Sequence, residues 1–200
     1  MKRHANGLKQ DALYYLSRKL VGHRSWDEEG NVAIEYAIRN NKKHGRFRDY
    51  HSNGVVCWAA CFVDGKEHGI SRQYDWDGNV IGSYRMRHGT GVDLWYRSRG
   101  ELSEERYVRE GKRNGYERWW RSRYRVYDET HFKDNLEHGI KRSWNSRGKL
   151  CRGYPQYFIN GLKVTKRTYV RASKQDASLP VYRKEEDNPR RTPPTFANAG

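Results

Sequence analysis

The sequence predicts an all-β fold: an elongated single-sheet solenoid of tandem β-hairpin repeats with short capping segments. Three observations lead to this prediction. Aromatic residues recur about every 24 residues, each repeat holds two turn signals, and 14% of the 200 residues are aromatic although only 35% are hydrophobic. So few apolar residues cannot fill a large compact core, whereas stacked hairpins order their rings by packing each repeat against its neighbours.

The period is visible as a set of aromatic residues with a fixed spacing. These are Trp26, Tyr50, Tyr74, Tyr96, Trp120 and Trp144, separated by 24, 24, 22, 24 and 24 residues. A glycine stands four positions later in every repeat but the fifth, where Tyr124 takes its place. Six such units between residues 25 and 166 define the predicted repeat domain.

Each repeat also carries two apolar positions. The first are Val32, Val56, Val80, Leu102, Val126 and Leu150. The second lie six residues further on, at Ile38, Phe62, Met86, Val108 and Phe132, and at Phe158 after a delay of two residues. Because side chains alternate between the faces of a strand, this even spacing predicts that both positions lie on one face.

A pair of turn-forming residues ends the strand that holds these apolar positions. The pairs are Asn40-Asn41, Asp64-Gly65, His88-Gly89, Glu110-Gly111, Asp134-Asn135 and Asn160-Gly161. Gly, Asn and Asp favour the positive φ angles of tight hairpins. A second glycine follows, and His44, His68 and His138 precede it at the same place in three repeats. Histidines repeated along a solenoid do not converge, so we expect turn histidines and no metal site.

The two ends depart from the repeat. Residues 1–24 hold six basic residues and one Asp, and they predict a basic N-terminal cap that is either a helix or a degenerate half repeat. Residues 167–179 predict a C-terminal cap, with a short helix beginning after Thr165 as its N-cap. Residues 180–200 contain four prolines and a Lys-Glu-Glu-Asp run, and we interpret them as a flexible tail, with an arm for a partner as the alternative.

The three cysteines and the start of the chain bear on the compartment. Cys57, Cys61 and Cys151 form no disulfide pattern, and we expect buried, reduced thiols in a reducing compartment. The basic, polar N-terminus lacks the apolar stretch of a secretory signal, and the longest apolar run, residues 54–63, is about half of what a membrane helix needs. We therefore expect a cytoplasmic or otherwise intracellular protein that is neither secreted nor transmembrane.

The net charge of +16 is unevenly distributed. The positions around the first turn of each repeat are acidic or neutral in the first three units and become arginine from the fourth unit onward. The candidate anion- or partner-binding residues are Arg97, Arg99, Arg121, Arg123, Arg125 and Arg147. Regularly spaced arginines beside aromatic rings suit phosphate groups of nucleic acid or anionic lipid, although solvated turns are the simpler interpretation.

No motif indicates catalysis. Carboxylates such as Asp64, Glu110 and Asp134 fall in equivalent turns of different repeats, and the sequence contains no nucleophile elbow, phosphate-binding loop or metalloprotease signature. We expect a protein that is not an enzyme, with no cofactor and no small-molecule substrate.

Landmarks of the second and third repeats carry a family resemblance. Residues 64–69 (Asp-Gly-Lys-Glu-His-Gly) and 74–80 (Tyr-Asp-Trp-Asp-Gly-Asn-Val) resemble the variant class of MORN repeats, also found in bacterial proteins labelled YwqK-type antitoxins. The resemblance implies an open β-hairpin solenoid that acts as a scaffold for protein partners, with possible self-association. The alternatives are a binder of anionic phospholipid or nucleic acid and an antitoxin-like neutraliser of a toxin.

Overall fold

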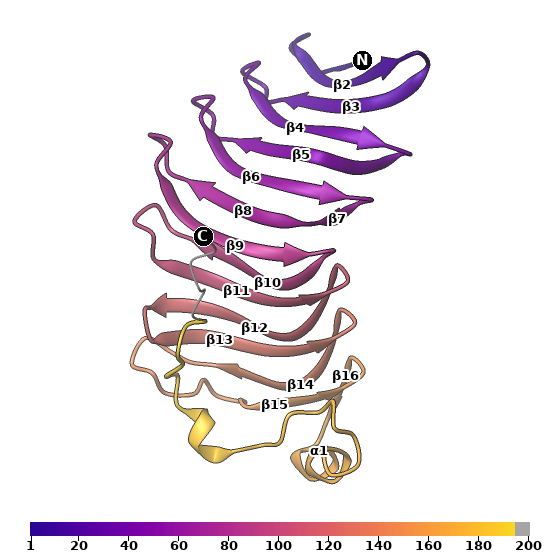
Figure 1. Cartoon of the computed structure of the whole chain (residues 1–200). Coiled ribbons are helices and arrows are strands. Elements are labelled where there is room, and N and C mark those ends of the chain that lie inside the picture. Colours follow the sequence, from indigo (N-terminus) through magenta and orange to yellow (C-terminus); the bar gives the residue numbers. More distant parts are fainter. Residues whose placement is uncertain (195–200) are drawn as a thin grey trace. The chain divides into compact units, whose positions relative to one another are not determined.

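The computed structural model describes residues 1–194 and contains one open antiparallel sheet of sixteen strands (Figure 1). Across the sheet the strands follow their order in the sequence, except that the short β7 pairs only with β6. The first nine strands are β1 (Lys2–Arg3), β2 (Lys9–Leu16), β3 (Lys19–Trp26), β4 (Val32–Arg39), β5 (Lys42–Tyr50), β6 (Val56–Val63), β7 (Lys66–Glu67), β8 (Gly69–Tyr74) and β9 (Val80–Arg87). The other seven are β10 (Thr90–Tyr96), β11 (Leu102–Arg109), β12 (Lys112–Ser122), β13 (Arg125–Lys133), β14 (Leu136–Ser143), β15 (Gln156–Ile159) and β16 (Leu162–Val164). The prediction of an all-β sheet of tandem hairpins is confirmed.

The chain divides into two compact units. The first unit comprises residues 1–91 with 98–100, and the second comprises residues 92–97 with the chain from residue 101 onward. Each unit is a run of antiparallel hairpins with its own packed side chains.

The predicted tight turns are confirmed by their backbone angles. Asn40 and Asn41 have φ angles of 51° and 59°, and all six predicted pairs have positive φ at both positions. Two consecutive positive φ angles are the mark of a type I′ turn, whose twist matches that of the flanking strands. Ser17 and Arg18, with φ of 46° and 64°, form a seventh turn of this kind that the sequence analysis did not predict.

The turn histidines connect successive repeats. In three repeats the ring Nδ1 accepts a hydrogen bond from the backbone N–H of the first residue of the next tight turn. The pairs are Asp64 N–H to His44 (3.3 Å), His88 N–H to His68 (3.2 Å) and Asn160 N–H to His138 (3.1 Å). This bond fixes the spacing of neighbouring hairpins and explains why histidine recurs at that place.

The prediction that both apolar positions of a repeat share one face is wrong. In the second repeat Val56 pairs with Tyr50, whose hydroxyl donates to Glu35, whereas Phe62 packs against Phe47 on the opposite face. The register between β5 and β6 shifts at Tyr50. A β-bulge adds one residue to a strand and reverses the alternation beyond it, and the same shift recurs at Trp26, Tyr74 and Trp120.

The N-terminal segment is a hairpin and not a helix. Residues 2–26 form β1, β2 and β3, and the Gly22 that suggested a half repeat pairs with Tyr14 across that hairpin. The interpretation as a helix is therefore wrong for this segment.

The C-terminal cap contains the expected short helix. Helix α1 (Lys166–Ala172) begins after Thr165, whose side chain accepts a hydrogen bond from the Thr168 N–H. Its buried Tyr169 packs with Ile140, Tyr157 and Leu179. The helix thus covers the end of the sheet at β14 and β15.

The prediction of a flexible tail from residue 180 is wrong for residues 180–194. A short 3₁₀ helix, η1 (Lys184–Asp187), follows the cap, and the backbone carbonyl of Pro189 accepts a hydrogen bond from Val126 N–H in β13. Pro189 itself is buried. The remainder of the predicted tail, residues 195–200, lies outside the described residues.

Candidate interaction surfaces

One face of each unit carries a row of alternating charges across its strands. In the second unit the register places Glu105, Arg118, Glu129 and Arg142 side by side on β11 to β14. Arg118 bridges Glu105 at 2.8 Å and Glu129 at 2.7 Å, and Arg142 meets the other oxygen of Glu129 at 3.1 Å. We call this arrangement, and its counterpart in the first unit, the Arg–Glu row. The buried Glu129 thus lies between two arginines, and the buried Glu105 meets Arg118 and the ring N–H of Trp120, so both carboxylates have partners, as burial requires.

The C-terminal segment completes the row of the second unit. Arg142 is 1% exposed, and its guanidinium also meets Glu186 at 3.3 Å and Asp187 at 3.1 Å. Arg191 donates to both oxygens of Glu129, at 2.7 and 2.9 Å. Burial on its own would raise the pKa of Glu129, but the hydrogen bonds and charges of Arg191 and Arg118 outweigh it and lower this pKa to about 2. The segment therefore acts as a partner that supplies the missing charges.

The first unit has the same row, but it is interrupted. Register places Arg24, Glu35, Arg48, Ala59, Arg72 and Ser83 next to one another on β3, β4, β5, β6, β8 and β9. Glu35 meets Arg24 at 2.6 Å and Arg48 at 3.1 Å. The hydrogen bond from Tyr50, together with those from Arg24 and Arg48, lowers the pKa of Glu35. A strict alternation of arginine and glutamate would place a carboxylate at the positions of Ala59 and Ser83.

Arg72 lies between these two uncharged residues. It is exposed, and within residues 1–194 no carboxylate or hydrogen-bond acceptor pairs with its guanidinium. Arg46 and Arg85 lie on the same face, opposite Cys61 and Ile70 in the register, and they too are exposed and unpaired in the described part of the chain. We call Arg46, Arg48, Arg72 and Arg85 the arginine face of the first unit.

Two hollows lie on the arginine face. One, of about 600 Å³, is lined by Arg46, Arg48 and Arg72 and has the small side chains of Ala59 and Cys61 among its walls. The other, of about 330 Å³, lies beside Gly22 and Ala37 and shares Arg46 and Arg48. Small residues thus leave space between cationic side chains.

The opposite face of the first unit holds its aromatic residues. Tyr36 stacks on Phe47 with ring centres 5.7 Å apart, and Phe47 contacts Trp58 and Phe62 at 4.9 and 5.6 Å. The ammonium of Lys43 lies 4.6 Å from the ring centre of Phe47, and burial lowers its pKa. These aromatic rings of the first unit are therefore ordered by stacking between strands.

The six arginines predicted from the sequence are all exposed, but they are not equivalent. Arg97 donates to the Trp120 carbonyl and meets Glu101 at 3.8 Å, which fixes it within the fold. Arg121 and Arg123 lie near the rings of Tyr127 and Tyr124, at 5.4 and 5.2 Å from the ring centres. The other three are Arg99, Arg125 and Arg147. The backbone of Arg125 forms an isolated antiparallel β-bridge with that of Arg190.

The fifth repeat breaks the predicted regularity of these arginines. Here β12 and β13 are joined by the tight turn Arg123–Tyr124, in place of the longer loop with a glycine seen in the other repeats. The carbonyl of Tyr124 accepts a hydrogen bond from Arg191 N–H, so the C-terminal segment packs along this turn. The structure does not bring Arg97, Arg121, Arg123 and Arg147 into one repeated position.

The tryptophans near this edge are mainly packed. Trp120 and Trp144 are 0% and 2% exposed, and they contact Val126, Leu102 and Leu150. Trp120 donates its ring N–H to Glu105 at 3.1 Å, and Trp144 donates to the Asp187 carbonyl at 2.6 Å. Trp120 and Trp144 are therefore packing residues of the second unit.

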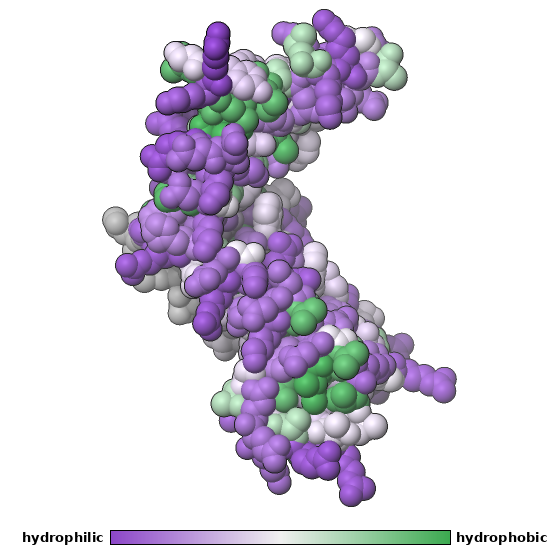
Figure 2. Space-filling view, turned by 90° about the vertical axis from the view of Figure 1, so that its right-hand side faces the viewer, coloured by the Kyte–Doolittle hydropathy of each residue, from purple (hydrophilic) through white to green (hydrophobic). Residues whose placement is uncertain are grey.

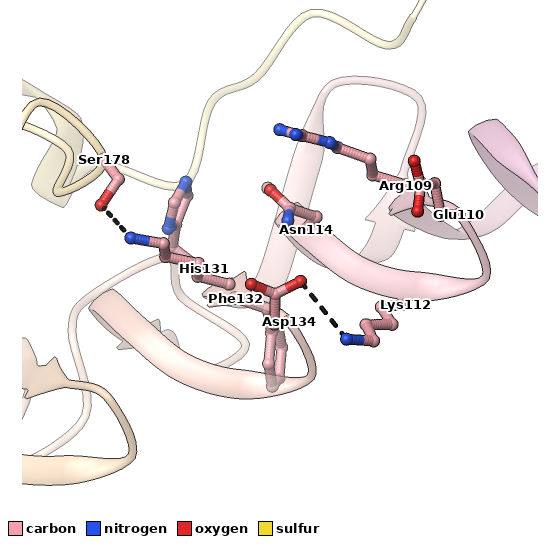
Figure 3. A pocket seen from close by; sticks show the side chains of 10 residues that line it. Arg109, Glu110, Lys112, Asn114, His131, Phe132, Asp134 and Ser178 are labelled. Carbon is pink, nitrogen blue, oxygen red and sulfur yellow. Dashed lines mark hydrogen bonds and ion pairs between the residues drawn. The ribbon is translucent and has the colours of Figure 1, made fainter.

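A further pocket of about 380 Å³ lies in the second unit between the β11–β12 and β13–β14 turns (Figure 3). Its walls include Arg109, Lys112, His131 and Asp134, and Figure 3 shows Lys112 facing Asp134, with the ions 3.8 Å apart. The His131 ring is hydrogen-bonded through Nδ1 to the His138 carbonyl at 2.6 Å, and burial lowers its pKa. Lys112 and Asp134 thus pair with each other, whereas the backbone of His138 holds the His131 ring.

Other features bear on metal, redox and membrane chemistry. Residues 1–194 contain no group of three or more His, Cys, Asp or Glu arranged to hold a metal. All three cysteines are free, and Cys61 is exposed, so the expectation that all the thiols are buried is wrong. In the described part of the chain, no helix has the length and apolar character needed to cross a membrane. The surface seen in Figure 2 is mostly hydrophilic, with hydrophobic side chains only in small separate groups.

The Arg–Glu row was missed by the sequence analysis, although the sequence carries a signal for it. An arginine stands two positions before the repeat aromatic in five of six units, at Arg24, Arg48, Arg72, Arg118 and Arg142. A glutamate follows the first aliphatic position by three residues at Glu35, Glu105 and Glu129. This charge repeats within the strands, whereas the six predicted arginines were chosen near the turns.

Comparison of the chain with models of known protein families and with curated proteins found no match.

Proposed function

We propose that this chain is a non-catalytic repeat scaffold that binds a protein partner on an open face of its sheet. The proposal rests on one contrast between the units. In the second unit the chain's own C-terminal segment covers the Arg–Glu row, and Arg142 is 1% exposed. In the first unit the corresponding Arg48 is 42% exposed, and unpaired arginines surround a hollow. An exposed face whose arginines have no carboxylate partner is typical of a surface that binds another molecule.

The repeat pattern supports the same proposal. The hairpins resemble the MORN variant class, and proteins built from such stacked units present extended surfaces to their partners. The free thiols of Cys57, Cys61 and Cys151 favour a reducing, intracellular compartment for this function.

The test is capture of the full chain's partner from cells that natively produce it, after nuclease and detergent treatment. We expect one defined protein to be retained in a stoichiometric complex. Recovery of nucleic acid or lipid alone, with no protein retained once these are removed, would contradict the scaffold function.

A second candidate is binding of an anionic polymer or lipid through Arg97, Arg99, Arg121, Arg123, Arg125 and Arg147. The observation in its favour is that all six side chains are exposed. Replacing Arg97, Arg121 and Arg123 by Ser should then weaken retention on heparin and flatten its salt dependence, because fewer counterions are released. Unchanged retention would exclude these residues as the binding site.

A further inference from the structure

We propose that the arginine face of the first unit binds an acidic segment of a partner protein, whose carboxylates take the two places in the Arg–Glu row that Ala59 and Ser83 leave uncharged. The inference rests on the proposed scaffold function and specifies the chemistry of the partner.

This face of the first unit carries an excess of positive charge. Arg24 lies on the same side of the sheet as the four residues of the arginine face, whereas Glu35 is the carboxylate that the register places in the row. Glu35 is already engaged by Arg24, Arg48 and Tyr50. The face therefore carries a net positive charge that no carboxylate in residues 1–194 neutralises at Arg72.

The arginine face also has room for a carboxylate beside Arg72. Ala59 lies directly between Arg48 and Arg72 in the register, and Ser83 lies on the other side of Arg72. A carboxylate at either place would meet arginine as Glu129 meets Arg118 and Arg142. The hollow of about 600 Å³ above Ala59 admits such a group from outside.

In the second unit the chain pairs its own carboxylates with an arginine of the row. There Glu186 and Asp187, on the η1 segment, bind the guanidinium of Arg142, the last arginine of the row. The apolar residues Leu179 and Tyr182 precede this pair and pack with Tyr157. Within the chain itself, the Arg–Glu row of the second unit thus pairs with an acidic run preceded by apolar residues.

Protein is favoured over nucleic acid by the shape of this face. The arginines alternate with Ala, Ser, Cys and Ile side chains across neighbouring strands, which suits separate carboxylates on a peptide. Tyr74 lines the hollow beside Arg72 but is only partly exposed, and the rings of Phe47 and Trp58 belong to the opposite face, so this face offers little ring surface on which bases could stack.

The experiment uses the full chain labelled with ¹⁵N and a short synthetic peptide that carries the Glu-Glu-Asp run of residues 185–187 between apolar residues. A peptide with Gln-Gln-Asn in place of this run is the matched control. We expect the acidic peptide to shift the side-chain Nε–Hε resonances of Arg46, Arg72 and Arg85, and the amide peptide to leave them unchanged.

The decisive variant is Ala59→Glu, which supplies the missing carboxylate from the chain itself. It should weaken peptide binding about tenfold, since it occupies Arg48 and Arg72 and adds a repulsive charge. Ser146→Glu makes the same charge change in an exposed loop of the second unit and should alter binding less than about twofold. Arg72→Gln, at an exposed side chain, gives a second test that does not depend on how the new glutamate packs.

Three results would overturn the inference: equal binding of the peptide by A59E and wild type, equal shifts by the amide peptide, or stronger shifts of the same arginines by a single-stranded oligonucleotide. Capture of the native partner distinguishes the failure of this inference from the failure of the scaffold function. A captured protein that binds A59E and R72Q as tightly as wild type refutes the acidic site but leaves the scaffold, whereas the absence of any captured protein refutes the scaffold.

Discussion

Arg142 and Asp187 are 45 residues apart in the sequence, yet the Nε–H of Arg142 donates to Oδ1 of Asp187 over 3.1 Å. Their side chains are 1% and 19% exposed. This contact joins a segment that looked disordered by composition to the most buried arginine of the sheet. It explains why the second unit has a covered Arg–Glu row.

Asp187→Asn should destabilise the second unit by about 1–2 kcal/mol, because the amide still accepts a hydrogen bond but no longer balances a buried charge. Urea unfolding followed by tryptophan fluorescence measures this loss. Asp134→Asn is the matched control, since its ion pair with Lys112 is more than half exposed, and it should change the free energy by less than about 0.5 kcal/mol. Equal effects of the two substitutions would contradict the role of Asp187.

The lowered pKa of Glu129 predicts that the folded chain loses stability in acid. Its pKa falls from the ordinary 4.5 to about 2 in the folded chain. A lowered folded pKa means that the stabilisation is complete above the unfolded pKa and is lost as pH falls from about 4.5 toward 2. Glu129→Gln should cost about 3 kcal/mol at neutral pH, because it removes a charge partner from Arg118, Arg142 and Arg191. The difference in unfolding free energy between wild type and E129Q should shrink through this window; a difference independent of pH would contradict the account.

His138 should contribute more stability than His44, its counterpart in an earlier repeat. The side chain of His138 is fully buried, and that of His44 is 23% exposed. His138→Ala, which leaves the Asn160 N–H without its acceptor, should cost about 2 kcal/mol, and His44→Ala about 0.5 kcal/mol. Equal losses for the two substitutions in chemical unfolding would show that burial does not set the strength of this bond.

The contribution of His138 to the free energy of unfolding should depend on pH. Burial and then the charge of Lys133 lower the pKa of His138 below its usual 6.5. Its contribution is therefore present above pH 6.5 and is lost as pH falls through the lower folded pKa, where protonation removes the Nδ1 acceptor. The difference in unfolding free energy between wild type and H138A should narrow below pH 6.5. A constant difference down to the acid transition would contradict a neutral, accepting ring.

Two glycines at equivalent places should differ in their tolerance of alanine. A Cβ on Gly139 would lie 2.7 Å from the Cβ of His131, whereas a Cβ on Gly69 meets nothing within 4 Å. Both have positive φ, of 144° and 97°. Gly69→Ala should therefore cost about 1 kcal/mol from backbone strain, and Gly139→Ala about 2–4 kcal/mol because overpacking adds to that strain. Thermal unfolding of the two variants measures the difference, and a smaller loss for G139A would refute the crowding argument.

Local signals in the sequence were sufficient for the hairpins. Turn pairs such as Asn40-Asn41 and Asp64-Gly65 favour positive φ through their own chemistry, and the structure has it at each of them. The helix after Thr165 was likewise predictable from a cap residue followed by helix-forming side chains. These features depend on residues that are adjacent in the chain.

Features that depend on register and distant contacts could not be predicted. The bulge at Tyr50 reverses which face Val56 occupies, and no pattern of period two reveals a single inserted residue. Asp187 appeared to belong to a charged, proline-containing tail, because its buried partner Arg142 becomes apparent only in three dimensions. The six arginines chosen from the turns therefore did not include Arg72, whose significance comes from its uncharged neighbours across the strands.

The most direct test of the account is hydrogen exchange of the arginine Nε–Hε groups in the free, full-length chain, measured by NMR. We predict slow exchange for Arg118, Arg142 and Arg191, which the Arg–Glu row and the C-terminal segment enclose, and fast exchange for Arg46, Arg72 and Arg85 on the open face of the first unit. Protection of Arg72 equal to that of Arg142 would contradict an arginine face that is free to receive a partner.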